Sequence, residues 1–174
     1  MIKAVEKTGT EPFVISRVFD APRELVFKAF TDPEHMKHWW GPKGFKVIKS
    51  AMDLRPGGMY HYGLESPDGM KMFGRFIYRE ISAPESIVLV SSFSDEHGGI
   101  TRHPMSPTWP REMLSRFDFE DIGVGKTKLT VSWTPINESD EERETFEKGR
   151  PSMTQGWGGT LEQLEAYLAS AQKS

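Results

Sequence analysis

The sequence contains no cysteine and no long hydrophobic run, and neither sign of charge dominates it. Without cysteine the chain cannot form disulfides, thiolate metal sites or a cysteine nucleophile. No stretch of about 18 apolar residues occurs, so no membrane span is predicted. The first ten residues lack the apolar core of a signal peptide, and we therefore expect a cytoplasmic protein. The formal net charge of −3, with no stripe of Lys and Arg, argues against nucleic acid as a partner.

Signatures of catalysis and of metal binding are also missing. No G-x-S-x-G, phosphate-binding glycine loop or H-E-x-x-H pattern occurs. His35 and His38 lie three residues apart, but the pattern supplies no third ligand. We therefore expect no metal and no cofactor, and the sequence assigns no catalytic residue. Whether the protein is an enzyme stays open.

The size and composition are those of an ordinary globular protein, with 37% hydrophobic and 27% charged residues. A chain of 174 residues fits a single domain, which we place at residues 1–174 with its core at about 13–171.

The last stretch, Gly149 to Ala171, has the apolar period of a helix. Its stripe consists of Met153, Trp157, Thr160, Leu161, Leu164, Leu168 and Ala171. Gly156, Gly158 and Gly159 surround the indole in the middle of this stripe, although each glycine costs a helix about 0.5–1 kcal/mol relative to alanine. Two interpretations stay open. The glycines allow close packing of the helix on a sheet, or they leave room for something small.

The rest of the chain has the pattern of an antiparallel sheet with two short helices after the first strand. We expect strands at 13–19, 45–53, 59–65, 70–81, 86–93, 111–121 and 126–134, joined mainly by turns. Asp20 and Asp32 are the expected caps of the two short helices, the second of which carries Trp39 and Trp40 and ends at 41–42. Short hairpins imply antiparallel neighbours. The fold class is α+β, with six to seven strands covered by the long final helix.

The segment 94–110 interrupts this regular spacing. It is too long for a hairpin and contains Gly98, Gly99, Pro104, Pro107 and Pro110. It is either a lid over a binding site or a mobile excursion.

Ordered motifs along nearly the whole chain resemble one known family. They are DAPR at 20–23, VFKAFTDP at 26–33, WWGP at 39–42, PGGMY at 56–60, PDG at 67–69, PESI at 84–87 and GW at 156–157. This set is similar to the START-like SRPBCC superfamily, and more narrowly to the activator of heat-shock protein 90 ATPase homologue family (Aha-type, C-terminal-domain-like). The resemblance implies a helix-grip fold of the START and birch-pollen-allergen kind. It also implies a sheet–helix cavity that takes lipids, polyketides or other apolar molecules.

Aromatic and methionine side chains are the best candidates for the wall of such a cavity. We expect it to include Trp39, Trp40, Met59, His61, Met72, Phe76, Phe93, Phe117, Trp133, Met153, Gly156, Trp157, Thr160 and Leu161. Thr160 would provide a hydroxyl on an apolar helix face. His61 would be a polar anchor or general base if it points inward, and a solvated strand residue if it points outward.

The sequence favours binding of a small hydrophobic molecule of lipid or polyketide type. Two alternatives stay open. One is an enzyme of the cyclase or hydrolase type acting on an apolar substrate in the same cavity. The other is a protein-binding module like the chaperone cofactor that gives the family its name. A homodimer also stays open, and apolar lining alone cannot identify the ligand.

Overall fold

The computed structural model describes residues 10–173 and contains a seven-stranded sheet in which every neighbouring pair is antiparallel. The strand order is β1-β7-β6-β5-β4-β3-β2. The strands are β1 (Phe13–Phe19), β2 (Lys46–Met52), β3 (Met59–Glu65), β4 (Lys71–Ser82), β5 (Ser86–Ser94), β6 (Met113–Gly123) and β7 (Lys126–Pro135). The helices are α1 (Arg23–Thr31), α2 (Pro33–Met36), α3 (Asp140–Lys148) and α4 (Arg150–Ala171). The predicted fold class is confirmed.

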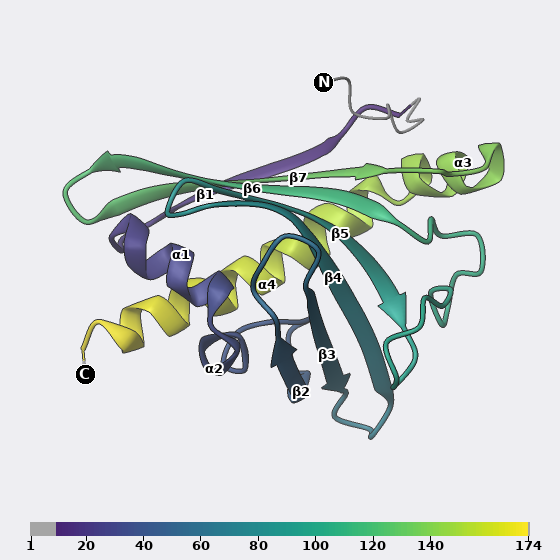
Figure 1. Ribbon diagram of the computed structural model, residues 1–174, viewed down its shortest axis with the longest axis horizontal. Coiled ribbons are helices and arrows are strands. Elements are labelled where there is room, and N and C mark those ends of the chain that lie inside the picture. Colours follow the sequence, from purple (N-terminus) through teal and green to yellow (C-terminus); the bar gives the residue numbers. More distant parts are fainter. Residues whose placement is uncertain (1–9, 174) are drawn as a thin grey trace.

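The sheet curves around α4, which runs across its concave side (Figure 1). The residues of α4 that are buried belong to the stripe expected from the sequence, namely Met153, Trp157, Thr160, Leu161, Leu164 and Leu168. They cover the apolar face of the sheet, where Phe117 on β6 pairs with Val131 on β7. Burial of this face is the main favourable term for a fold of this type.

The inward side of β1 could not be chosen from its sequence, since apolar residues occupy both faces. Phe13 and Phe19 are buried, whereas Val14 and Val18 are exposed. The odd-numbered residues therefore face α4, because successive side chains of a strand alternate between the two faces of the sheet.

The two short helices differ from the expectation in their ends. Pro22, not Asp20, occupies the N-cap of α1, and the Asp20 carboxylate accepts a hydrogen bond from Lys126 Nζ instead. The cap of α2 is confirmed, because the Asp32 side chain accepts from the backbone N–H of Glu34. This helix ends at Met36 rather than at Gly41-Pro42.

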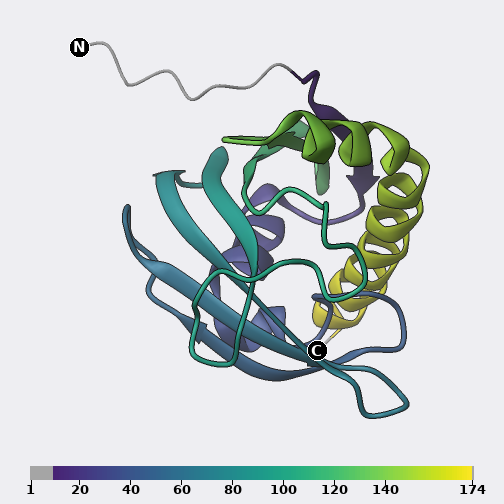
Figure 2. The same cartoon turned by 90° about the vertical axis from the view of Figure 1, so that its right-hand side faces the viewer.

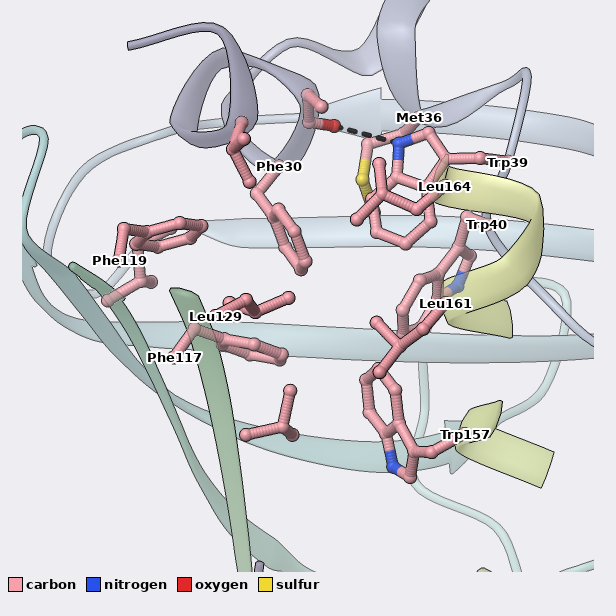
Figure 3. Close-up of a cluster of buried hydrophobic side chains, with 14 of the residues drawn as sticks. Phe30, Met36, Trp39, Trp40, Phe117, Phe119, Leu129, Trp157, Leu161 and Leu164 are labelled. Carbon is pink, nitrogen blue, oxygen red and sulfur yellow. Dashed lines mark hydrogen bonds between the residues drawn. The ribbon is translucent and has the colours of Figure 1, made fainter. Parts of the chain in front are cut away.

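Because α2 ends early, Trp39 and Trp40 follow it in a turn. Their side chains point in different directions. The indole of Trp39 points back to α1, where its Nε1 donates to the carbonyl oxygen of Ala29 at 3.1 Å, the dashed line in Figure 3. The Trp40 ring lies beside Trp157 of α4, with 5.8 Å between ring centroids.

The helix α3 begins with a capping box. The Ser139 side chain accepts from the backbone N–H of Glu142, and the Glu142 side chain accepts from the backbone N–H of Ser139. Within residues 10–173, none of the helices is both long and apolar enough to cross a membrane.

Candidate ligand-binding cavity

A cavity of about 220 Å³ lies between the sheet and the N-terminal half of α4. Its walls come from β3, β4, β5, β6, β7, α4 and two connecting segments. The lining residues are Trp40, Gly41, Pro42, Tyr62, Leu64, Met72, Phe76, Ser91, Ser92, Phe93, Trp109, Pro110, Met113, Trp133, Met153, Gly156, Trp157 and Thr160. Hence side chains far apart in sequence meet at one site.

Aromatic rings form the part of the wall next to the core. The Trp157 ring lies between the rings of Trp40 and Trp133, with centroid distances of 5.8 Å and 5.4 Å and steep interplanar angles. Trp40 also meets Phe76 edge to face at 5.4 Å. Edge-to-face contacts of this kind fix ring orientation. The wall on this side is therefore held in place by its own packing.

The glycines of α4 are not explained by close packing against the sheet. A Cβ atom built on Gly156, Gly158 or Gly159 would have no heavy atom within 4 Å, apart from the backbone of the helix itself and the chain neighbours. Of the three, only Gly156 lines the cavity. Gly156 is an exposed residue at the rim of the cavity, with open space beside it, which is compatible with the interpretation that the helix is thinned there.

Many of the residues expected at the cavity do line it. These are Trp40, Met72, Phe76, Phe93, Trp133, Met153, Gly156, Trp157 and Thr160. Trp39, Met59, His61, Phe117 and Leu161 do not. The Phe117 ring packs deeper in the core, 5.1 Å from the ring of Phe30 on α1, and Leu161 lies in the same cluster (Figure 3).

His61 is on the other face of the sheet. Its neighbours along β3, Tyr60 and Tyr62, point inward, so His61 points outward, where the segment after β5 covers it. His61 Nε2 lies 3.2 Å from Ser94 Oγ and 3.2 Å from the carbonyl oxygen of Asp95. Burial lowers the pKa of His61. The inward interpretation of His61 is therefore wrong, and the ring is neither solvated nor available to a ligand in the cavity.

Sequence reasoning missed several residues of the lining. They are Gly41, Pro42, Tyr62, Leu64, Ser91, Ser92, Trp109, Pro110 and Met113. Strand alternation would have found Tyr62 and Leu64, which share a face with Tyr60. It would also have found Ser91, which shares a face of β5 with Leu89 and Phe93.

The Thr160 hydroxyl is not free for a ligand. Its Oγ1 lies 3.1 Å from the carbonyl oxygen of Gly41 and 3.2 Å from that of Gly156. Gln163 Nε2 donates to the same Gly41 oxygen at 2.7 Å. These bonds join α4 to the turn that carries Trp40, so Thr160 positions the wall.

No lining residue carries a formal charge at neutral pH. The one titratable side chain of the lining is Tyr62, and burial raises its pKa, so the phenol stays neutral. Ser91 Oγ lies 3.1 Å from Ser115 Oγ, a pair of hydroxyls buried on the inner face of β5 and β6. The cavity is therefore apolar and uncharged, with a few polar atoms.

The segment between β5 and β6 closes one side of the cavity with Trp109 and Pro110. It is anchored on α3. Arg102 forms an ion pair with Glu142, Thr108 Oγ1 lies 2.7 Å from Thr145 Oγ1, and the Trp109 ring lies 6.0 Å from that of Phe146. Figure 2 shows this teal segment running between the sheet and the two C-terminal helices.

A second group of polar rings lies away from the cavity, where α2 meets the C-terminal part of α4. The Tyr167 hydroxyl is 2.6 Å from His35 Nδ1, and the His38 ring stacks on Tyr167 with 5.1 Å between centroids. These contacts hold α2 on α4. In the described part of the chain, no three His, Asp or Glu side chains are arranged to hold a metal ion.

Comparisons with known proteins agree with this architecture. A crystal structure of a Mycobacterium smegmatis protein is 22% identical, with a TM-score of 0.73, and the match covers 95% of this chain and 94% of that one. A solution structure from Arthrobacter aurescens is 23% identical, with a TM-score of 0.77 and coverage of 97% and 92%. The AHSA1 protein from Silicibacter pomeroyi is 18% identical, with a TM-score of 0.70 and coverage of 92% and 99%.

At these identities the structural matches show a shared fold. No curated protein matches the sequence. The family described as Activator of Hsp90 ATPase homolog 1-like protein matches residues 20–169, which is most of the chain. The chain therefore belongs to the Activator of Hsp90 ATPase homolog 1-like protein family.

Proposed function

We propose that this protein binds one small, neutral, hydrophobic molecule of lipid or polyketide type in the cavity between the sheet and α4. The observation that carries the proposal is the lining, which combines aromatic and aliphatic side chains from both helix and sheet and includes no charged group. Apolar pockets with a few placed polar groups are the usual form of small-molecule sites. The family to which the chain belongs commonly binds hydrophobic ligands.

The volume of the cavity limits the size of the ligand. An engineered cavity of about 150 Å³ in another protein binds benzene. A cavity of about 220 Å³ suits a molecule of one or two rings, or a short branched segment of a larger one. Binding rather than catalysis is favoured because the lining offers no carboxylate, imidazole or amine for acid–base chemistry.

The test is a titration with 6-propionyl-2-(dimethylamino)naphthalene, an uncharged two-ring naphthylamine dye whose emission shifts to the blue in apolar surroundings. A neutral dye is required because no cation lines the cavity. We expect saturable binding near one dye per chain, with quenching of tryptophan emission by the bound dye. Absence of saturable binding contradicts the proposal and leaves the protein-binding interpretation.

A matched pair of variants locates the dye. Gly156→Leu places a side chain in the open space of the cavity, whereas Gly159→Leu places the same side chain on α4 outside the lining. We expect Gly156→Leu to weaken dye binding at least about tenfold, which corresponds to about 1.4 kcal/mol. Gly159→Leu should bind like the parent. Equal affinity of the two variants would show that the dye binds elsewhere.

A further inference from the structure

Residues 102–111 connect to the rest of the protein through side chains rather than through the backbone. The last backbone hydrogen bond before them runs from the Thr101 N–H to the Phe93 carbonyl oxygen, at 3.0 Å. The next one after them runs from the Ile136 N–H to the Glu112 carbonyl oxygen, at 3.1 Å. In between, within the described part of the chain, the backbone hydrogen bonds of the segment only close its own two turns. A segment held in this way opens at a lower free energy than a strand or a helix of the core.

A few side-chain contacts dock this segment on the C-terminal helices. Besides the ion pair and the threonine contact with α3 described above, the Trp109 ring lies against the bare backbone of Gly149. A Cβ atom at Gly149 would come within 2.9 Å of Trp109 Cζ3. All these contacts are made with the region from Glu142 to Gly149, so the segment can leave it in one movement.

The other irregular part of the cavity wall is held more firmly. The Gly41 carbonyl oxygen accepts a hydrogen bond from Gln163 Nε2 and lies 3.1 Å from Thr160 Oγ1, so the turn that carries Trp40, Gly41 and Pro42 is tied to α4. Apart from this turn and the 102–111 segment, the lining residues belong to strands or to α4. The 102–111 segment, which contributes Trp109 and Pro110, is therefore the part of the wall that is able to move.

His103 joins the first turn of this segment to the wall of the cavity. Its Nδ1 accepts a hydrogen bond from the Met105 N–H at 3.0 Å, and its ring centroid lies 4.6 Å from that of Phe93 and 6.4 Å from that of Trp109. Phe93 and Trp109 both line the cavity. A protonated imidazole carries a hydrogen on each nitrogen, so it cannot accept from Met105. Proton uptake therefore removes a bond inside the segment and places a charge between two aromatic rings of the wall.

The surroundings of His103 offer nothing to balance this charge. The ring contacts β5 through Phe93 and its own segment through Met105 and Trp109, and none of these side chains titrates. The preceding residue, Arg102, is itself a cation, paired with Glu142 of α3. Burial lowers the pKa of His103, and within the described residues no carboxylate is paired with it. The neutral ring therefore fits the docked segment and the charged ring does not.

We propose that residues 102–111 form a lid over the cavity, which stays closed while His103 is neutral and opens when His103 takes up a proton, so that the bound molecule is released at acidic pH. This inference rests on the proposed function and adds the regulation of the same site. The closed lid adds Trp109 and Pro110 to the surface that contacts the ligand.

The test measures the dissociation rate constant of the naphthylamine dye in a stopped-flow experiment at pH 8 and at pH 5, with circular dichroism at each pH to verify that the protein is folded. We expect the rate constant of the parent to rise about three- to tenfold at pH 5, the range of one lost hydrogen bond. His103→Asn should have the same rate constant at both pH values, because the asparagine Oδ1 accepts from Met105 without titrating.

The control variant is His61→Gln. His61 is the other histidine whose pKa burial lowers, and its Nε2 lies 3.2 Å from Ser94 Oγ and 3.2 Å from the Asp95 carbonyl oxygen, on the outer face of the sheet. Lys49, Arg75 and Asp95 also act on its charge. Glutamine keeps a side-chain donor there without titrating, so His61→Gln should retain the parental rise at pH 5.

A disulfide tests the movement of the lid directly. The sequence contains no cysteine, and Thr108 Oγ1 lies 2.7 Å from Thr145 Oγ1, so Thr108→Cys combined with Thr145→Cys places two sulfur atoms within reach of each other across the docked interface. The oxidised protein should release the dye slowly at both pH values. Reduction should restore the parental rate constants, and the two forms share every substitution.

The outcomes separate the lid from the binding site. If the oxidised and reduced forms release the dye equally fast, the segment is not a lid and the ligand passes the exposed rim at Gly156. If the parental rate constant is the same at pH 8 and pH 5, or if His103→Asn keeps the rise, His103 does not open the lid. In these cases the dye still binds and the proposed function stands. If no dye binds at pH 8, the proposed function is wrong, and the lid with it.

Discussion

Thr160 Oγ1 on α4 lies 3.1 Å from the carbonyl oxygen of Gly41, in the turn that presents Trp40 to the cavity. The hydroxyl that interrupts the apolar stripe of α4 therefore links this helix to the turn at Gly41. The bond connects residues 119 positions apart and is buried. Its role is to hold the Trp40 turn against the helix that carries Trp157.

Replacement of Thr160 by valine should destabilise the protein by about 1 kcal/mol. The change keeps the shape of the side chain and removes one buried hydrogen bond, whose usual contribution is about 0.5–1.5 kcal/mol. Gln163 continues to donate to the Gly41 oxygen, which limits the loss. Urea unfolding of Thr160→Val and of Thr154→Val measures the effect.

Thr154→Val is the matched control on the same helix. The Thr154 hydroxyl donates only to the Arg150 carbonyl oxygen one turn earlier, at an exposed position. We expect Thr154→Val to change the free energy of unfolding by less than about 0.5 kcal/mol, as for most surface substitutions. Equal effects of the two variants would show that the bond to Gly41 contributes no more to the free energy of unfolding than the exposed bond of Thr154.

The two tryptophans at 39 and 40 show how far sequence reasoning could go. Their place after two short helices was predicted, because proline and aspartate mark the start of α2. That the two rings point in different directions was not predicted. It depends on α2 ending at Met36, and the end of a four-residue helix is set by tertiary contacts. Trp39 joins the core under α1, whereas Trp40 joins the cavity.

The bounds of several strands were predicted well, including those of β1, which has apolar residues on both faces. The two ends of β3 agree with the expectation, as do those of β1. The face to which His61 points was left open, since Tyr60, His61 and Tyr62 combine apolar bulk with polar ends. Tertiary contacts decide it, because Tyr62 packs against Trp40 on the cavity side and His61 lies against Ser94 and Asp95 on the other face. Trp109 was not predicted to line the cavity because it lies in a segment without the repeating apolar pattern of a helix or a strand.

Alanine at two glycines of the C-terminal region should have opposite effects. Gly159→Ala adds a methyl group with no heavy atom within 4 Å outside the local helix backbone, so improved helix propensity should raise stability by about 0.5–1 kcal/mol. At Gly149 the same methyl group would lie 2.9 Å from Trp109 Cζ3 and 3.2 Å from the Thr145 carbonyl oxygen. This overpacking should lower stability by about 1–3 kcal/mol.

Thermal and urea unfolding of both alanine variants measure these effects. Gly149→Ala should also weaken the contact of the Trp109 segment with α3, and a shift in tryptophan emission would report it. A stabilised Gly149→Ala would mean that Trp109 moves away without cost. A destabilised Gly159→Ala would mean that this position has a packing partner.

Stability should fall as the pH drops below neutrality, because the buried His61 and the half-buried His103 are held neutral. His103 Nδ1 accepts a hydrogen bond from the Met105 backbone N–H at 3.0 Å, and its ring packs 4.6 Å from that of Phe93. Burial lowers the pKa of His103. Burial also lowers the pKa of His61, against the opposing effect of the Asp95 carbonyl. A protonated histidine donates from both nitrogens and so cannot keep the bond from Met105.

The direction follows from proton uptake. Between the lowered folded pKa of each histidine and its unfolded value of about 6.5, the unfolded chain binds more protons than the folded one. The stabilisation is therefore complete above about pH 6.5 and is lost as the pH falls through the folded pKa. Carboxylates contribute mainly below about pH 4.5. Urea unfolding between pH 5 and 8 should show a falling free energy of unfolding below pH 6.5.

His103→Asn separates the contribution of this ring, since its Oδ1 can accept from Met105 without titrating. The asparagine variant should be less stable than the parent at pH 8, because it loses the contact with Phe93, and should have a flatter pH profile. His97→Asn is the control, because the His97 side chain is 84% exposed on the same segment. It should keep the parental slope. A parental profile that is flat from pH 8 to 5 would show that neither His61 nor His103 is held neutral by the fold.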